Sequence, residues 1–442
     1  MRVRPLAGQP VLKPVQALVL PPTPRTRRGW FFFAALVLVC FSTVAGFSDT
    51  PSVQLGIDRL IANRYRELAG KRVGLITNPT AVDRHGNPTA RLLLKAPNVR
   101  LVALFAPEHG LNGDLPAGKE FPNMTNRETG LPVYSLYGPG PTRKPTPAML
   151  KGIDVLVYDL QDTGCRTYTY ISTLGLAMEA CANAGVEFIV LDRPNPLGGV
   201  RVEGPMLDPR FKSFVGQWPV PYLYGLTPGE LARMINGERW ITNSCKLRVI
   251  AMEGWRRSMV WKDTGLRWVP TSPNVPRSES VLGLAATGLL GEIGGLSIGI
   301  GTSTPFECIG APWLKSKRAC DYLNGKNIDG VRFSAISFTP ARGMYKNQTV
   351  PGVQLWFSKP ATAPLYALNF HFLEMADKVF GQNLFAQATK RGQSFQMFDK
   401  VNGTDAVRRD LQAGRAATEI IAKWRDGENR FRKQRAKYLI YQ

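Results

Sequence analysis

The sequence predicts a protein of the α/β class, in which a parallel β-sheet is followed by a second, α+β domain. Between Val53 and Arg193, helical patterns alternate with short apolar runs, which is typical of parallel β-α units. After about Pro270, Pro- and Gly-rich segments are interspersed with strand-like runs, which indicates a second domain. With 442 residues and 44% apolar composition, the chain can bury a large core in two domains. We expect these domains at residues 52–272 and 273–442.

Four runs in the first domain are nearly continuous in apolar residues, as expected for strands that are buried on both faces of a parallel sheet. These runs are Arg72–Thr77, Leu101–Ala106, Asp154–Asp159 and Glu187–Asp192. The segments between them are long enough for crossover connections. In the second domain, Val331–Phe338 and Val353–Phe357 have a strand-like character, and residues 406–442 read as basic helix.

Apolar stripes and capping signals predict three helices in the first domain. Two stripes end at a glycine: Leu60, Ile61, Tyr65 and Leu68 before Gly70, and Ile171, Leu174, Met178 and Cys181 before Gly185. The third helix begins at Thr227-Pro228-Gly229-Glu230, which supplies an N-cap, an N1 proline and a capping-box glutamate. It is expected to bury Leu231, Met234 and Ile235.

Residues 1–47 predict an export signal or a membrane anchor. The basic, proline-rich segment Met1–Arg28 leads into an uncharged apolar run, Trp30–Phe47. Small residues at Thr43 and Ala45 suit cleavage after Ala45, whereas an uncleaved run would serve as a short membrane span. The preceding arginines resemble a twin-arginine signal and equally an ordinary basic n-region. We therefore expect an exported protein, in the periplasm or at the cell surface.

The net charge of +23 suits a polyanionic partner, such as the cell wall, lipid head groups or nucleic acid. Export and the lack of a nucleic-acid motif disfavour nucleic acid. Five cysteines follow the signal without metal-type spacing, so they are buried thiols or supply one disulfide. The sequence also lacks the motifs of zinc hydrolases, serine esterases and nucleotide-binding loops, which disfavours these classes and predicts no metal site.

Polar residues follow all four predicted strands of the first domain. Ligands of open parallel sheets bind at these carboxyl ends, because loops converge there and helix N-termini point positive dipoles at the crevice. The four strand ends are Thr77-Asn78-Pro79-Thr80, Pro107-Glu108-His109-Gly110, Asp159-Leu160-Gln161-Asp162 and Asp192-Arg193-Pro194-Asn195-Pro196. A single polar strand end is common, but four in succession predict a site.

Glu108 is the strongest candidate for a catalytic acid. It directly follows an apolar strand, and Pro107 and Gly110 would fix and expose a tight turn. A carboxylic acid held there could protonate a leaving oxygen, while the alternative is a capping or turn carboxylate. His109 would orient this acid or bind a sugar hydroxyl, unless it is a structural histidine.

The other strand ends offer partners for Glu108. Asp159 and Asp162 are candidates for the second carboxylate that glycoside hydrolysis usually needs, unless one of them caps the following helix. Arg166 and Arg193 could each bind a substrate carboxylate or pair internally with an aspartate. Tyr168 could stack on a sugar face or belong to the core.

Short motifs occur in order along most of the chain, from about Leu55 to Trp356. They are Val73–Thr80, Pro107–Gly110, Tyr158–Asp162, Arg166–Tyr170, Leu191–Pro196, Val202–Pro205, Gly225–Leu231, Ser272–Asn274, Thr304–Glu307 and Gly310–Trp313. Together they resemble the NamZ-type exo-β-N-acetylmuramidase family, which consists of peptidoglycan glycoside hydrolases. The resemblance implies a Rossmann-like catalytic domain at residues 52–272, a smaller C-terminal α+β domain at 273–442 and a cleft between them.

The resemblance also implies an activity and a set of site residues. The expected reaction is the release of terminal N-acetylmuramic acid from the non-reducing end of peptidoglycan fragments, without a cofactor. Glu108 would be the catalytic acid, and Asp159 and Asp162 would be its partners. The expected substrate-binding residues are Asn78, His109, Arg166, Tyr168, Asp192, Arg193, Asn195, Glu203 and Glu307.

The chain departs from the family pattern near the presumed cleft. Leu223-Tyr224 stands where the family commonly has Arg-His, and Gly291–Gly301 lacks the family's Asn and the Arg of a Gly-Arg-Gly turn. Two alternatives therefore stay open: a non-catalytic glycan-binding protein of the cell wall, and a glycosidase for another N-acetylated or acidic sugar. Retention of Glu108 favours a hydrolase.

Overall fold

The computed structural model of the chain describes residues 53–139 and 143–442. The predicted export signal or anchor at residues 1–47, including Cys40, lies outside these residues. Within the described ranges, no helix is long and apolar enough to cross a membrane. The five cysteines of the described part are buried and free, so the alternative of one disulfide among them is wrong.

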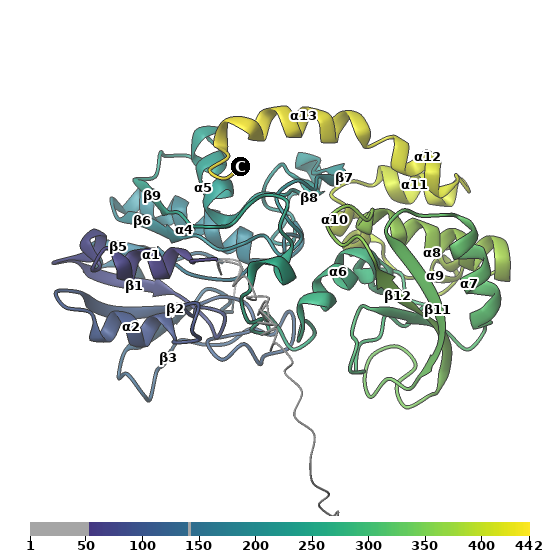
Figure 1. The fold of residues 1–442 in the computed structure, drawn as a ribbon, viewed down its shortest axis with the longest axis horizontal. Coiled ribbons are helices and arrows are strands. Elements are labelled where there is room, and N and C mark those ends of the chain that lie inside the picture. Colours follow the sequence, from purple (N-terminus) through teal and green to yellow (C-terminus); the bar gives the residue numbers. More distant parts are fainter. Residues whose placement is uncertain (1–52, 140–142) are drawn as a thin grey trace, which may run out of the picture. The chain divides into compact units, whose positions relative to one another are not determined.

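The first domain is built on a mainly parallel sheet (Figure 1). The strand order is β3-β4-β2-β1-β5-β6-β9, and only β3 runs antiparallel to its neighbour. The strands are β1 (Arg72–Ile76), β2 (Arg100–Ala106), β3 (Met124–Thr125), β4 (Pro132–Ser135), β5 (Val155–Tyr158), β6 (Glu187–Leu191) and β9 (Leu247–Ile250). The four predicted strands are confirmed as β1, β2, β5 and β6. Strands β3, β4 and β9 were not predicted, because they are short and only partly apolar or partly buried.

Helices cover both faces of this sheet, which explains the continuous apolar strands. In β5, Val155 and Val157 pack into a core shared with α1 (Gly56–Ala62) and α2 (Thr89–Lys95). Leu156 and Tyr158 point the other way, into a core shared with α3 (Pro147–Leu150), α4 (Tyr170–Ala184) and α5 (Pro228–Gly237). Successive strand residues face opposite sides, so a strand between two helical layers is apolar at every position.

The predicted helices α4 and α5 are confirmed with their caps. The α4 helix ends at Gly185, which has a left-handed φ of 70°, and Thr227 and Glu230 form the capping box of α5. The first predicted helix is wrong in its length. The α1 helix ends at Ala62, Tyr65 has a φ of 55°, and a 3₁₀ turn, η1 (Arg66–Leu68), follows. The apolar residues of the predicted helix nevertheless pack in one core. Two short segments, α1 and η1, therefore bury the residues that were expected on one face of a single helix.

The second domain is smaller and contains the predicted strands, which confirms the fold class. Its antiparallel sheet has the order β10-β12-β11, with β10 (Cys308–Gly310), β11 (Val331–Phe338) and β12 (Val350–Phe357). The helices are α6 (Ser278–Thr287), α7 (Ser316–Gly325), α8 (Leu365–Phe380), α9 (Leu384–Lys390), α10 (Gln396–Asn402), α11 (Ala406–Gln412), α12 (Ala417–Ala422) and α13 (Arg425–Arg435). A small hairpin, β7 (Glu203–Met206) and β8 (Pro221–Leu223), packs against α13.

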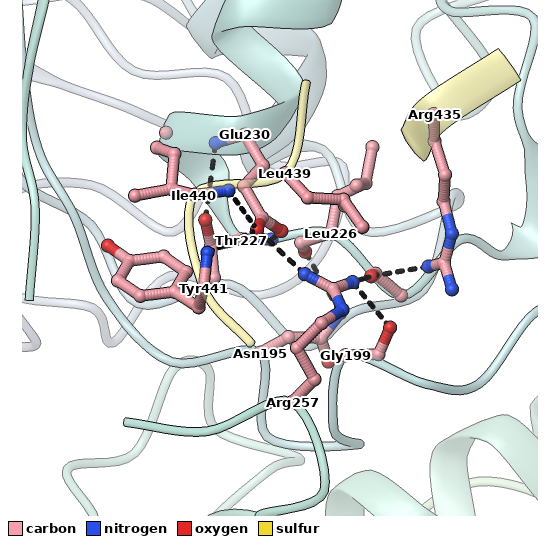
Figure 2. A network of polar contacts seen from close by, with 12 residues as sticks. Asn195, Gly199, Leu226, Thr227, Glu230, Arg257, Arg435, Leu439, Ile440 and Tyr441 are labelled. Carbon is pink, nitrogen blue, oxygen red and sulfur yellow. Dashed lines mark hydrogen bonds and ion pairs between the residues drawn. The ribbon is translucent and has the colours of Figure 1, made fainter. Parts of the chain in front are cut away.

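The last residues of the chain bind to the first domain through a buried polar network (Figure 2). The carboxylate of Glu230 is fully buried and forms an ion pair of 2.7 Å with Arg257. It also accepts a hydrogen bond from the backbone N–H of Ile440, at 2.9 Å. The hydroxyl of Tyr441 donates to Asp192 at 2.5 Å. The C-terminal residues thereby donate hydrogen bonds to carboxylates that are buried in the first domain.

Candidate active site

Glu108 lies in a tight turn directly after β2. Its neighbours His109 and Gly110 both have left-handed backbone angles, with φ of 71° and 75°. For a histidine this conformation is uncommon, and such residues occur often at functional sites. The imidazole is held by a 2.8 Å contact between its Nδ1 and the carbonyl oxygen of Leu115. The turn therefore fixes both Glu108 and His109, as the sequence predicted.

Two hydrogen bonds orient the carboxylate of Glu108, which is 7% exposed. The backbone N–H of Gly118 donates to Oε1 at 2.7 Å, and the hydroxyl of Thr169 donates to Oε2 at 2.6 Å. Hydrogen bonds of this kind fix the geometry of a carboxylate. Thr169 is the residue before α4, so the start of this helix positions the candidate catalytic group.

Glu108 lines a cavity of about 360 Å³, which we call the Glu108 cavity. The first domain contributes Glu108, His109, Thr167, Tyr168 and Tyr222 to its wall, and residues 272–306 contribute Ser272, Asn274, Glu292, Ile298, Ile300 and Phe306. Its volume is at the lower end of the range for small-molecule sites, which is about 300–1,000 Å³. Apolar walls with a few convergent polar groups suit a sugar, which has both apolar faces and hydroxyl edges.

The charged groups that line the Glu108 cavity are acidic. Among the described residues in its wall there are two carboxylates, Glu108 and Glu292, and neither lysine nor arginine. The arginine Arg342 lies close by, since it donates a hydrogen bond of 2.7 Å to the side-chain oxygen of Asn274. Arg342 is exposed, and in the described part of the chain its guanidinium forms no ion pair.

Asp159 and Arg193 bind each other and lie outside the wall of the Glu108 cavity. Nε of Arg193 is 2.5 Å from Oδ1 of Asp159, and both side chains are almost fully buried. The hydroxyl of Thr89 donates to the other oxygen of Asp159, at 2.6 Å, at the start of α2. The geometry therefore favours the internal ion pair that was the alternative over a catalytic role of Asp159.

Asp162 is fully buried and also lies outside the wall of the Glu108 cavity. Its Oδ1 accepts hydrogen bonds from the hydroxyl of Tyr224 and the backbone N–H of Gly164, both at 2.7 Å. Its Oδ2 is buried and lacks a hydrogen-bond partner in the described residues. Burial raises the pKa of Asp162 to about 7. Asp162 thus supports a loop of the first domain, and its placement does not favour catalysis.

We expect Asp162→Asn to raise the melting temperature at pH 8 and to change it much less at pH 4. A carboxyl group whose pKa is raised on folding contributes stability at low pH, and this contribution is lost as the pH rises from about 4 to 7. Asn cannot ionise and still accepts both hydrogen bonds. Thermal unfolding at both pH values measures the effect, with the exposed Asp114→Asn as the control. A lower melting temperature at pH 8 would contradict this assignment, and a selective loss of turnover would restore a catalytic role.

Three other predicted substrate-binding residues have structural partners. Asp192 is fully buried, and its oxygens accept hydrogen bonds from Arg193 N, Gly229 N, Thr227 Oγ1 and Tyr441 Oη. Asn195 binds Leu226 O and Leu197 N. Arg166 donates to three backbone carbonyls, of Pro205, Val220 and Val401, and burial lowers its pKa to about 10. These hydrogen bonds lie inside the protein, which does not support contact of the three residues with substrate.

Glu203 and Glu307 also lie away from the Glu108 cavity. Glu203 accepts a hydrogen bond of 2.8 Å from the backbone N–H of Ala367, near the start of α8. Glu307 forms an ion pair of 2.5 Å with Arg277 and accepts from the hydroxyl of Ser280. Of the predicted binding residues, His109 and Tyr168 share the cavity with Glu108.

Asn78 and Arg193 line a different cavity of about 600 Å³ beyond the carboxyl ends of β1, β5 and β6. The strand order reverses between β1 and β5, and open α/β sheets commonly bind ligands there. Asn78 is held by hydrogen bonds with Tyr170 and Thr80. The rule that polar strand ends bind ligands therefore grouped into one site residues that line two separate cavities.

Glu292 is the charged wall residue that the sequence-based prediction missed. It lies at the end of a 3₁₀ segment, η4 (Gly288–Glu292), which follows α6. The available signal was a lone carboxylate in the largely apolar and Gly-rich run Gly288–Ile298. The chain departs from the family pattern in the overlapping segment Gly291–Gly301. Glu292, Ile298 and Ile300 of this segment line the Glu108 cavity.

Known proteins resemble this chain over both domains. Family models of the exo-β-N-acetylmuramidase NamZ match residues 73–279, for the N-terminal part, and 282–441, for the C-terminal part. The peptidoglycan β-N-acetylmuramidase NamZ of Bacillus subtilis (strain 168) is 41% identical over 391 residues, which cover 88% of this chain and 92% of that protein.

Two crystal structures of DUF1343 family proteins from Bacteroides fragilis NCTC 9343 have the same fold. One is 43% identical with a TM-score of 0.82, and the other is 31% identical with a TM-score of 0.66. Each match covers 88% of this chain and 99% of the other. The resemblance that the motifs indicated is confirmed, and the chain belongs to the NamZ family of exo-β-N-acetylmuramidases.

Proposed function

We propose that this protein is an exo-acting glycoside hydrolase that releases terminal N-acetylmuramic acid from the non-reducing end of peptidoglycan fragments. The observation that carries the proposal is Glu108, a carboxylate fixed by two hydrogen bonds in the wall of a cavity between the two domains. The name of the B. subtilis relative supports the substrate. A cavity of about 360 Å³ suits the end of a glycan better than a long stretch of it.

Hydrolysis of a glycosidic bond needs groups that protonate the leaving oxygen and assist the attack of water at the anomeric carbon. Glu108 lies where it could serve one of these steps, and His109 and Tyr168 lie beside it in the wall. Arg342, bound to Asn274, offers a cation for the lactyl carboxylate of muramic acid, since Arg166 and Arg193 have other partners. Such a hydrolase acts in cell-wall turnover.

A panel of chromogenic glycosides tests this function. We expect turnover of the N-acetylmuramic acid glycoside and slower turnover of the N-acetylglucosamine glycoside, which lacks the lactyl group. Turnover of the second substrate alone would favour the glycosidase for another sugar, an alternative supported by the lack of lysine and arginine among the described wall residues. Saturable binding without product would favour the non-catalytic binding protein.

We also propose that the protein is exported, because Arg25, Arg27 and Arg28 precede the apolar run Trp30–Phe47 and the substrate belongs to the cell wall. The expected mature protein begins after Ala45 and is found in the periplasm or at the cell surface. Mass spectrometry of the N-terminus after cell fractionation measures this. An intact Met1 in the soluble cytosolic fraction would contradict export, and an intact Met1 in the membrane fraction would favour the anchor.

A further inference from the structure

The carboxylate of Glu292 lines the Glu108 cavity without a partner. In the described ranges its oxygens form neither an ion pair nor a hydrogen bond, whereas its backbone carbonyl accepts a hydrogen bond of 2.8 Å from the side chain of Gln393. The backbone is therefore anchored while the side chain stays free. A partly buried carboxylate without a counterion costs free energy, and groups of this kind occur often at functional sites.

Glu108 and Glu292 have opposite surroundings within one cavity. Glu108 accepts hydrogen bonds at both oxygens, from the backbone N–H of Gly118 and the hydroxyl of Thr169, so both oxygens act as acceptors. Glu292 lines the same cavity, whose wall also includes the apolar residues Leu284, Ile298 and Ile300, and its carboxylate accepts no hydrogen bond in the described part. Two carboxyl groups whose environments differ in this way are the usual arrangement for an acid and an ionised partner.

We infer that Glu292 is the second catalytic carboxyl group and donates the proton to the leaving oxygen, while Glu108 acts as the ionised partner. This inference rests on the proposed glycosidase function and replaces Asp159 and Asp162 as candidates. Burial raises the pKa of Glu292, which is the direction that a proton donor needs. The sequence had suggested Glu108 as the donor, because only the folded chain brings Glu292 to the same cavity.

The reaction balances with these two groups and water. The bond between the anomeric carbon and the leaving oxygen breaks, its electron pair stays on that oxygen, and the proton of Glu292 joins it. A water oxygen bonds to the anomeric carbon, either directly with Glu108 accepting the water proton, or after Glu108 has formed a glycosyl ester that water cleaves. In the first route the proton returns from Glu108 to Glu292 through solvent, and in the second the water proton goes to Glu292.

The dependence on the leaving group tests the assignment. Gln at position 292 keeps the shape of the side chain but cannot give up a proton. We expect Glu292→Gln to lower kcat/KM on a disaccharide capped by N-acetylmuramic acid by about a hundredfold or more, the scale of general acid catalysis. A dinitrophenyl glycoside of the same sugar needs little protonation and should lose less than about tenfold. Glu279→Gln, an exposed change on α6, is the matched control and should leave both rates unchanged.

The outcomes separate this inference from the proposed function. If the wild-type protein turns over the disaccharide and Glu292→Gln does so equally well, Glu292 is not catalytic and the function stands. Equal losses on both substrates would contradict the role as proton donor, and thermal unfolding of the variant identifies a loss that is due to misfolding. Glu292→Asp retains an acid and should therefore recover part of the disaccharide activity. A purely structural effect of Glu292→Gln would lower the rates on both substrates by a similar factor, whatever their leaving group. A wild-type protein inactive on every glycoside would overturn both proposals.

Discussion

Glu108→Gln is expected to lower kcat on the capped disaccharide by about a hundredfold or more, with little change in KM. Gln keeps the shape and one of the two hydrogen bonds to Gly118 and Thr169, but it has neither a negative charge nor a transferable proton. Because the loss concerns the transition state, binding of the substrate should change little. Steady-state kinetics of the purified variant measure the effect, and thermal unfolding checks its folding.

The leaving group again distinguishes the roles. If Glu108 is the ionised partner of Glu292, Glu108→Gln should lose as much activity on the dinitrophenyl glycoside as on the disaccharide. Activity that is spared on the dinitrophenyl glycoside would assign the proton to Glu108, as the sequence alone suggested. Glu253→Gln is a suitable control, because Glu253 is exposed, pairs with Arg59 and lines neither of the two cavities described above. Rates near those of the wild type would make Glu108 a turn residue without a catalytic role.

Asp159→Asn is expected to lower the free energy of unfolding by about 3–5 kcal/mol, because it leaves the charge of Arg193 buried without a counterion. The folded fraction should keep its turnover, since Asp159 does not line the Glu108 cavity. Urea unfolding followed by circular dichroism measures the stability, and activity is compared per folded molecule. A catalytic Asp159 would show the reverse, with lost turnover and unchanged stability.

A matched control lies at the other end of the same strand. Asp154 precedes β5 and pairs with Arg72, and both side chains are substantially exposed, at 39% and 45%. Solvent screens such a pair and weakens its contribution to stability. Asp154→Asn should therefore change the unfolding free energy much less than Asp159→Asn. Equal effects would contradict the assignment of Asp159 and Arg193 as a buried structural pair.

Most helices and strands of the first domain could be predicted from local sequence patterns, and the exceptions have physical reasons. Strands β1, β2, β5 and β6 were predictable because burial on both faces makes every position apolar. The edge strand β9 was not predictable in this way. Its second residue, Arg248, is exposed, and Ile250 is the one residue of the strand that is buried. The stripe after Gly56 predicted one helix, yet Tyr65 turns left-handed and divides it, which apolar spacing does not record.

The candidate site was predicted in part by the rule that polar residues at strand ends bind ligands. The rule correctly placed Glu108 and His109 in one turn and in one cavity. It also selected Asp159, Asp162 and Asp192, whose carboxylates are buried among internal partners. A strand end needs helix caps and ion pairs as much as it needs ligands, so the residue type alone does not separate the two uses.

The sequence by itself determined the α/β class, the second domain, the family and the turn that carries Glu108. These follow from hydrophobic periodicity, capping residues and contiguous motifs, which are set by neighbours in the chain. The tertiary structure alone decided that Asp159 pairs with Arg193 and that Tyr441 binds Asp192. It also decided that Glu292 lines the cavity of Glu108. Such partners are far apart in sequence, and the direction and burial of each side chain depend on how the sheet, the helices and the second domain pack together.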